Sequence, residues 1–513
     1  QGSVDTEDFT RTTPNPIDRQ QTNALLQLSV TPSDTSEWRA AVEVYDTEAE
    51  TEVFSSRNPG SPFASAVLDS DGFDTQERTR FSLSNTSTSS SAAFDTSLFR
   101  AYFQTTDTVQ ETIDIRQPFI GVARRDGLLT FDQENLGLDV ELTKAVGSGS
   151  LLTYGLEVQR ETFDQLRDRS EFVIATGAPV PTSLAFPTKY FPESEVTETG
   201  LFAQLELSLL GGRLSLVPGV RFDRYDLDAD QNDAIFLAGN PGTPAPVDYE
   251  EDSVSPKLGL VLDLTDDVSV FAQYAEGFRA PPMSAVNNGF TNFGGGYRTL
   301  PNPDLEAETS DNLELGLRAS GTWGSFSIAG FVNQYEDFIE TVFLGFNPAI
   351  FLVEFQPQNV TEVEISGLEL AGEWRFGRAW TLRGSYTYTE GDNEVSDEPL
   401  ESIAPAQLVL GLRYRANDGR WGAELIGTAT ASKDASDLPT GSTQFQVPSQ
   451  EVFDLAAWFA LTDQLELQLT VWNLTDETAW NWYWVRGQSQ TSSTLDRFTM
   501  PGVSGGLQVR YVF

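Results

Sequence analysis

The side chains that could do chemistry in this 513-residue sequence are limited, because it contains no histidine and no cysteine. Without these residues the chain has no Ser-His-Asp triad, thiol nucleophile, disulfide or iron–sulfur cluster. Metal ligation would have to come from oxygen donors or from the sulfur of one of the two methionines. Nothing else in the sequence resembles a catalytic constellation, so we expect that the protein is not an enzyme and has no intrinsic cofactor.

One acidic segment has a spacing that could bind calcium. Its candidate ligands are Asp226, Asp228 and Asp230. Closely spaced carboxylates can hold a hard cation through their oxygens. The EF-hand pattern, however, requires glycine where Gln231 stands and glutamate where Leu237 stands. A solvated acidic loop is the simpler interpretation, and a calcium site is the alternative.

The charge of the chain excludes another class of function. There are 76 acidic and 32 basic side chains, which give a net charge of −44. Binding to phosphate backbones needs clustered lysine and arginine, so we expect no nucleic-acid partner. A length of 513 residues would ordinarily suggest several soluble domains, but the pattern along the chain indicates something else.

Apolar and polar residues alternate along most of the chain, as they do on a β-strand with one apolar face. This alternation predicts 19 strands. They lie at about 20–32, 36–51, 75–87, 96–112, 128–145, 150–165, 195–208, 213–228, 250–263, 267–277, 308–320, 323–340, 359–375, 379–391, 404–416, 419–431, 450–461, 464–474 and 503–513. Within 359–375 the apolar positions change parity around Ser366-Gly367, which predicts a β-bulge there.

The connections between these strands alternate between tight turns and long segments. The long segments are 52–74, 113–127, 166–194, 229–249, 278–307, 341–358, 392–403, 432–449 and 475–502. Short turns at one end and long loops at the other are typical of an outer-membrane barrel, and a soluble sandwich has no reason to keep this rhythm. We therefore expect an all-β fold, a transmembrane antiparallel meander β-barrel that occupies residues 1–513.

The barrel interpretation assigns each strand face to lipid or to the lumen. In the segment 464–474 it places Leu465, Leu467, Leu469 and Val471 against lipid, and Glu466 and Gln468 in the lumen. Most tryptophans of the C-terminal half lie near predicted strand ends, where aromatic girdles meet the membrane interface.

Several motifs add a resemblance to a known family. Phe278-Arg279-Ala280-Pro281 is followed by Asn302-Pro303-Asp304-Leu305, with one glycine-rich segment between the two boxes. Asn473-Leu474-Thr475-Asp476 precedes Pro501-Gly502 and a terminal strand that contains Tyr511 and ends in Phe513. Together these motifs resemble the TonB-dependent outer-membrane receptors, in particular the haem and haemoglobin receptor branch. The resemblance implies that Tyr511 and Phe513 form the signal read by the outer-membrane assembly machinery.

The chain departs from this family in its number of strands. The family closes a barrel of about 22 strands around an N-terminal plug, whereas 19 strands and no plug are readable here. We therefore expect that the plug and about three first strands are contributed upstream or by another chain. In that case residues 20–32 would be an edge strand, or would pair imperfectly with 503–513.

A second departure concerns the ligand. Haem receptors of this kind commonly use a histidine between the two boxes, and here Tyr297 is the only strong candidate ligand for iron in that interval. Phe290 and Phe293 could stack on a porphyrin, and Arg279 or Arg298 could bind a propionate. The alternative for this interval is a flexible, glycine-rich loop tip.

The resemblance implies a receptor in the outer membrane of a Gram-negative bacterium, embedded in lipid, that imports an iron complex. Haem, free or taken from a haem protein, is the preferred ligand, and a ferric siderophore is the alternative. Import would depend on the TonB energy-coupling complex acting through the missing plug. A rival from another class is a passive porin or surface adhesin that has no plug.

Overall fold

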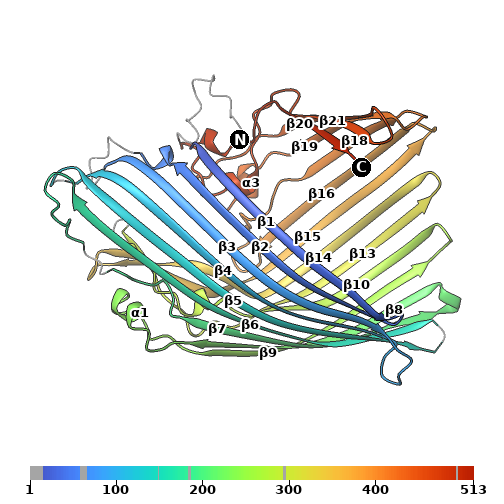
Figure 1. The fold of residues 1–513 in the computed structure, drawn as a ribbon, viewed down its shortest axis with the longest axis horizontal. Coiled ribbons are helices and arrows are strands. Elements are labelled where there is room, and N and C mark those ends of the chain that lie inside the picture. Colours follow the sequence, from blue (N-terminus) through green and yellow to red (C-terminus); the bar gives the residue numbers. More distant parts are fainter. Residues whose placement is uncertain are drawn as a thin grey trace.

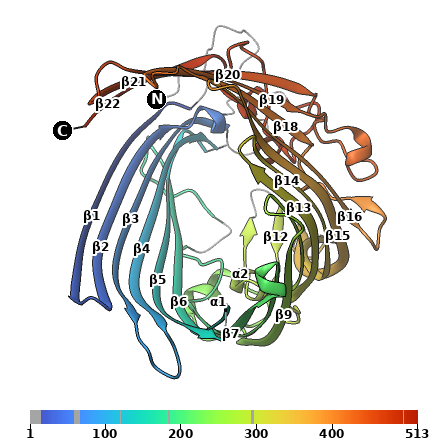
Figure 2. The same cartoon turned by 90° about the vertical axis from the view of Figure 1, so that its right-hand side faces the viewer.

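The computed structural model describes residues 15–57, 66–118, 120–147, 149–182, 186–292, 296–492 and 495–512. In these ranges 22 strands join into one sheet that curves around a central space (Figures 1 and 2). Three of the strands are only two or three residues long, so 19 long strands remain, as the alternation predicts. The all-β meander is therefore confirmed.

The long strands are β1 (Ile17–Ser33), β2 (Ser36–Glu52), β3 (Ala66–Thr88), β4 (Thr96–Gln117), β5 (Ala123–Val146), β6 (Ser150–Val173), β7 (Ser194–Leu209), β8 (Leu214–Ala229), β9 (Tyr249–Asp263), β10 (Val268–Arg279), β13 (Glu308–Gly321), β14 (Gly324–Asn347), β15 (Leu352–Phe376), β16 (Trp380–Asn393), β18 (Gln407–Arg415), β19 (Trp421–Thr430), β20 (Gln450–Ala460), β21 (Leu465–Trp472) and β22 (Ser504–Tyr511). The short strands are β11 (Thr291–Asn292), β12 (Tyr297–Thr299) and β17 (Glu398–Pro399). The helices are α1 (Ala234–Gly239), α2 (Met283–Val286), α3 (Trp482–Val485), η1 (Phe54–Ser56), η2 (Leu210–Gly212), η3 (Ala435–Asp437) and η4 (Leu495–Phe498). None of the helices in the described ranges has the length and apolarity needed to cross a bilayer.

Each long strand pairs antiparallel with the next long strand along the chain. The expected assignment of faces holds in β21. Gln468 lines a cavity together with Arg413 and Glu424, and Glu424 is paired with Arg413 at 3.0 Å. Leu467 and Leu469 point to the opposite face, in register with Val509 and Leu507 of β22. A row of apolar side chains therefore faces outward, where a bilayer would contact it.

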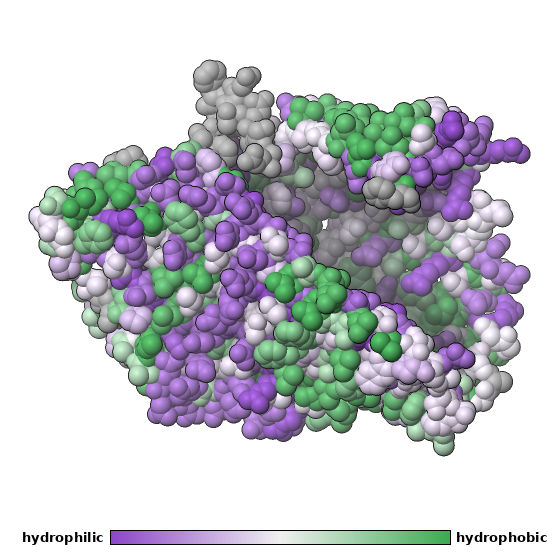
Figure 3. Space-filling view, viewed as in Figure 1, coloured by the Kyte–Doolittle hydropathy of each residue, from purple (hydrophilic) through white to green (hydrophobic). Residues whose placement is uncertain are grey.

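An aromatic belt marks the tight-turn end of β15 to β19. Trp374, Phe376, Trp380, Tyr414 and Trp421 form a chain of ring contacts, with successive centroids 5.2, 6.3, 4.9 and 5.0 Å apart. Amphipathic rings at this level are the usual anchor at a membrane interface. On the face shown in Figure 3, hydrophobic residues gather toward the tight-turn side of the first strands, and hydrophilic ones cover much of the loop side.

Two predicted long loops are instead extended hairpins. Strands β4 and β5 continue until only residues 118–122 connect them, and β14 and β15 until only 348–351 do. Beyond the membrane a strand can be polar on both faces, so its hydrogen-bonded ladder continues after the alternation has ended. The expectation of loops over 113–127 and 341–358 was therefore wrong.

The predicted β-bulge at Ser366-Gly367 is also wrong. The register of β15 runs through both residues without a shift against β14 and against β16. Val363 has the parity of the inward-facing Glu373 and is only 1% exposed. In the part of β15 beyond the membrane, the inward-facing side chains are buried and therefore apolar. The apolar residues thus change from one face of the strand to the other while the backbone register continues unchanged.

The first and last strands are edges of the sheet in the described part of the chain. All 17 residues of β1 are exposed, as are all but one of the eight residues of β22. β1 pairs with β2 and β22 with β21, and no pairing joins β1 to β22 within the described ranges. The space-filling view shows a hollow between the C-terminal strands and the first strands (Figure 3). Such edges carry unpaired backbone groups, which lipid cannot satisfy.

Candidate ligand-binding site

The segment between β10 and β13, residues 280–307, is held against the barrel wall. After α2 the chain forms the short hairpin β11–β12, and β12 pairs parallel with β15. The backbone N–H of Leu300 donates to the carbonyl of Phe355 at 2.8 Å, and the side chain of Gln356 donates to the carbonyl of Pro301 at 2.8 Å. The described residues of this segment are therefore anchored to β15.

The second box, Asn302 to Leu305, provides this anchoring. Asn302 donates from its side-chain amide to the carbonyl of Pro357 at 2.8 Å and accepts from the backbone N–H of Asp304 at 3.1 Å. Leu305 is 3% exposed and Pro303 is half-buried, whereas Asp304 is exposed. These contacts position the segment on β15.

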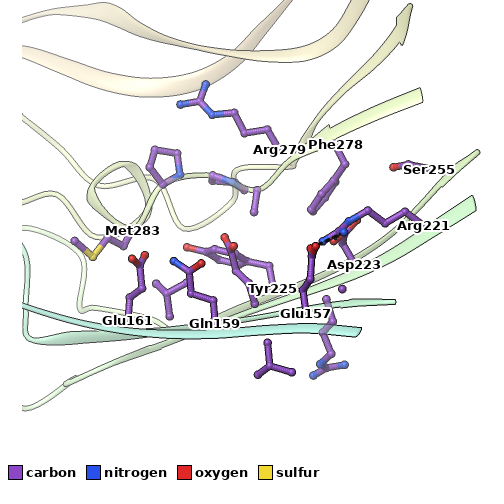
Figure 4. Close-up of a pocket in the computed structure, with 18 of the residues that line it drawn as sticks. Glu157, Gln159, Glu161, Arg221, Asp223, Tyr225, Ser255, Phe278, Arg279 and Met283 are labelled. Atoms are coloured by element: carbon purple, nitrogen blue, oxygen red, sulfur yellow. Dashed lines mark hydrogen bonds and ion pairs between the residues drawn. The ribbon is translucent and has the colours of Figure 1, made fainter. Parts of the chain in front are cut away.

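The first box contributes to a cavity of about 750 Å³ in the barrel wall (Figure 4). This volume is in the range of small-molecule sites. Phe278, Arg279 and Met283 line the cavity, with the guanidinium of Arg279 pointing away from Tyr225. Six carboxylates also line it, from Asp139, Glu157, Glu161, Glu198, Asp223 and Glu276. Arg221 neutralises part of this charge through bonds of 2.7 Å to Glu157 and to Asp223.

A connected row of aromatic rings contains two of the predicted ligand-binding residues. Phe290 contacts Tyr190 edge-on at 4.8 Å between centroids and Tyr297 at 5.7 Å. Tyr297 in turn contacts Phe355 at 6.1 Å. All four rings are half-buried. The Tyr297 hydroxyl has no hydrogen-bond partner among the described residues. The predicted Phe293 lies outside the described residues.

The two arginines expected to bind a propionate are both neutralised by glutamates. Arg298 donates to Glu354 through Nε at 2.8 Å and through a terminal nitrogen at 2.5 Å, with both side chains largely buried. Arg279 donates to Glu308 at 3.0 Å, and that glutamate is 8% exposed. Each arginine therefore holds the segment to the neighbouring strands.

Two arginines that the sequence analysis missed lie beside the aromatic row. The Cζ atom of Arg167 is 5.7 Å from the ring centroid of Phe186, 5.7 Å from that of Tyr190 and 6.0 Å from that of Phe290. The Cζ atom of Arg169 is 4.6 Å from the Phe186 ring. The only signal in the sequence was two basic residues with inward parity in a strongly acidic chain.

Three long loops pack together to support this region: residues 174–193, 230–248 and 280–307, called here the docked loops. Val286 is fully buried against Val196, Tyr225 and Leu227. Asn287 is 2% exposed, donating to the carbonyl and accepting from the N–H of Val247, both at 2.9 Å.

A buried ion pair joins the docked loops to β6. The Nζ of Lys189 lies 2.6 Å from Asp164 and 2.8 Å from Asp233, which also caps α1. Burial opposes the charge of Lys189, but the hydrogen bonds to Asp164 and Asp233 outweigh it and raise the pKa of the lysine. Burial likewise opposes the charge of Asp233, yet Lys189 and the N–H groups of Phe236 and Glu193 lower its pKa.

The predicted calcium ligands are not brought together. Asp226 is held by Arg224 at 2.7 Å, and Asp230 accepts from the backbone N–H of Asn232. Across the described ranges no group of three or more carboxylates is placed to hold a metal ion. Of the predicted assembly signal, Tyr511 pairs with Leu465 at the end of β22, and Phe513 lies outside the described residues.

Comparison with known proteins agrees with the geometry. Residues 3–474 match the family model described as TonB dependent receptor-like, beta-barrel. Haemoglobin-haptoglobin utilization protein B of Neisseria meningitidis is 27% identical in an alignment of 350 positions that covers 59% of this chain and 43% of that protein. Heme/hemopexin utilization protein C of Haemophilus influenzae is 28% identical in an alignment of 289 positions that covers 51% of this chain and 37% of that protein. The chain thus spans less than half of the length of these relatives.

Solved structures show the same fold at low sequence identity. The copper transporter OprC superposes with a TM-score of 0.73 at 18% identity, covering 96% of this chain and 72% of that one. The ferric yersiniabactin uptake receptor FyuA of Yersinia pestis gives a TM-score of 0.63 at 16% identity, covering 96% and 71%. These similarities concern the barrel architecture and not the ligand.

Proposed function

Because this chain belongs to the TonB-dependent receptor-like β-barrel family of the Gram-negative outer membrane, we propose that it is the barrel of a receptor that imports an iron complex, preferably haem. The observation that carries the ligand class is that the curated relatives are named for the use of haem or of haem-carrying proteins. The matching proteins are receptors and transporters, which fits a role in binding and passage and not in catalysis.

The exposed edges of β1 and β22 support the domain arrangement in this proposal. A plug and about three further strands, contributed upstream or by another chain, would pair with these edges and fill the lumen. The plug would link the barrel to the TonB energy-coupling complex. Tyr511 and Phe513 would serve as the outer-membrane assembly signal.

Tyr297 is the proposed iron ligand. Its hydroxyl has no partner in the described part of the chain, and Phe290 and Phe355 flank its ring. A phenolate oxygen is an established axial ligand of haem iron and suits the ferric state. Phe290 would pack on the porphyrin face, while Asn302, Pro303, Asp304 and Leu305 hold the segment in place.

Haem titration of the full-length receptor tests this proposal, followed by absorption spectroscopy beside Tyr297→Phe. We expect a high-spin ferric spectrum that is lost in the variant, together with weaker binding. Unchanged affinity and spectrum would remove Tyr297 from the site. Growth of a deletion strain with haem as the iron source tests import directly.

A ferric siderophore is the second candidate, favoured by the structural likeness to proteins such as FyuA. If neither the wild-type receptor nor Tyr297→Phe binds haem, we propose that the aromatic row binds a siderophore without direct metal ligation. A passive porin or adhesin is the third candidate. A signal peptide that directly precedes residue 1 in the gene would favour it, whereas a plug-like segment there would favour the receptor.

A further inference from the structure

We propose that Arg167 and Arg169 form an anion subsite at the loop end of the barrel wall, which binds the carboxylate groups of the imported ligand. In the case of haem these groups are the two propionates, and this identification rests on the proposed function. The existence of an anion subsite rests on the contacts of the two arginines alone.

The first argument is the charge balance of the inner wall. Arg116, Arg125, Arg167 and Arg169 lie at the loop ends of β4, β5 and β6 and share the inward parity of their strands. Two carboxylates share this surface: Glu171, which is 2.7 Å from Arg125 and 4.0 Å from Arg116, and Asp114, which is in register with Arg125. A chain of net charge −44 therefore holds a local excess of positive charge at this point.

The second argument is that nearby acidic groups are already engaged. Asp164 is paired with Lys189, and Glu161 accepts hydrogen bonds from Gln133 and Asn135. Neither Arg167 nor Arg169 forms an ion pair with any carboxylate in the described ranges. The guanidinium of Arg169 donates one hydrogen bond within the described ranges, to the hydroxyl of Thr182 at 3.2 Å. Most of the donors on these two guanidinium groups remain for a ligand.

The third argument is the aromatic surroundings. Three rings surround the guanidinium of Arg167, which holds it in place through cation–π contacts while leaving its N–H edge free. The ring of Phe290 contacts both Arg167 and the ring of Tyr297. A planar ligand across Phe290 can therefore place its centre toward Tyr297 and a carboxylate edge toward Arg167 and Arg169. Guanidinium groups suit this edge because they bind carboxylates with two parallel hydrogen bonds.

The experiment compares haem with haem whose propionates are esterified, using the full-length receptor in detergent. The variants are Arg167→Gln, Arg169→Gln and the double variant, with Arg124→Gln as the matched control. Arg124 lies at the same end of β5 but on the outer face, paired with Asp126 at 2.7 Å. Heat-modifiable electrophoretic mobility reports whether each barrel has folded. Arg167→Lys, which keeps the charge but not the planar fork, provides a second test.

We expect the wild type and Arg124→Gln to bind haem more tightly than its ester. Each arginine replacement should weaken haem binding roughly tenfold or more, as for loss of a charge-assisted hydrogen bond. The double variant should bind both compounds equally, and Arg167→Lys should be intermediate. A folded double variant that still prefers haem over the ester would overturn the subsite.

A wild type that binds neither porphyrin would refute haem as the ligand, and ferric citrate then tests the subsite by itself. Binding of ferric citrate that is lost in the double variant would support a carboxylate subsite for another ligand. Equal binding by both proteins, or no binding by either, would overturn it.

Discussion

Replacement of Asn287 by alanine should release the docked loops from the barrel wall. Asn287 is almost completely buried. Its side-chain amide accepts a hydrogen bond from the backbone N–H of Val247 and donates one to the carbonyl of Val247, both at 2.9 Å. The variant loses two hydrogen bonds and leaves two backbone groups without partners in a site too crowded for easy solvation. At about 1–2 kcal/mol for each of the two unsatisfied groups, local opening should become easier by roughly 2–4 kcal/mol.

Hydrogen exchange of the purified receptor measures this effect directly. A loss of 2–4 kcal/mol corresponds to roughly 30- to 1,000-fold faster exchange of amides that open with the loops. The acceleration should cover residues 230–248 and 280–292 and leave β18 to β21 unchanged. Asn232→Ala is the control, because that side chain is exposed in the same loop group. Less than a threefold change in exchange for Asn287→Ala would refute the view that this residue holds the loops together.

Three further predictions concern the membrane face, pH and a turn. Leu467→Arg should cost about 2–4 kcal/mol and reduce assembly in the outer membrane, measured by heat-modifiable mobility, whereas Gln468→Arg should assemble normally. Equal assembly of the two variants would contradict the assignment of Leu467 to the lipid face. Because the pKa of Asp233 is lowered in the folded protein, its stabilisation is complete above the ordinary value of 3.8 and is lost as the pH falls through the folded pKa. Protease resistance of the docked loops should therefore be constant from pH 7 to about pH 5 and fall below about pH 4, and Asp233→Asn should lack this acid step while being weaker at neutral pH. Gly324→Ala should block assembly, because a Cβ there would lie 1.8 Å from the carbonyl oxygen of Glu373. Gly377→Ala has no atom within 4 Å of its Cβ and should cost only the ~1–2 kcal/mol of a left-handed backbone. Similar yields of both variants would contradict this prediction.

Most of the barrel could be predicted from the sequence, because lipid on one side and water on the other impose a period of two on every membrane-crossing strand. The predictions failed where that contrast ends. Strand β14 continues to Asn347, and β5 begins at Ala123, in stretches where both faces are polar or both are partly covered. Val363 gave a false signal of a bulge for the same reason.

The site was less predictable, because charge pairing across the barrel is invisible in a linear motif. Arg298 and Arg279 stand in the expected segment, yet Glu354 and Glu308 neutralise them through strand contacts. Arg167 comes beside Phe290 only because the docked loops pack together, across more than a hundred residues of sequence. Tyr297 and Phe290 could be identified because they lie between two recognisable boxes.

The length of the strands fixes how high the barrel rises above the cell surface. A strand of 24 residues such as β6 is roughly 80 Å long and, tilted at about 40°, spans about 60 Å along the membrane normal. The apolar band of an outer-membrane barrel is only about 25 Å tall, so a rigid, hydrogen-bonded collar projects well beyond the membrane. Arg167 lies six residues from the rim of this collar. If the ligand is delivered by a carrier protein, as the proposed function allows, a carrier too wide to enter the barrel would meet the rim a short distance from the arginines.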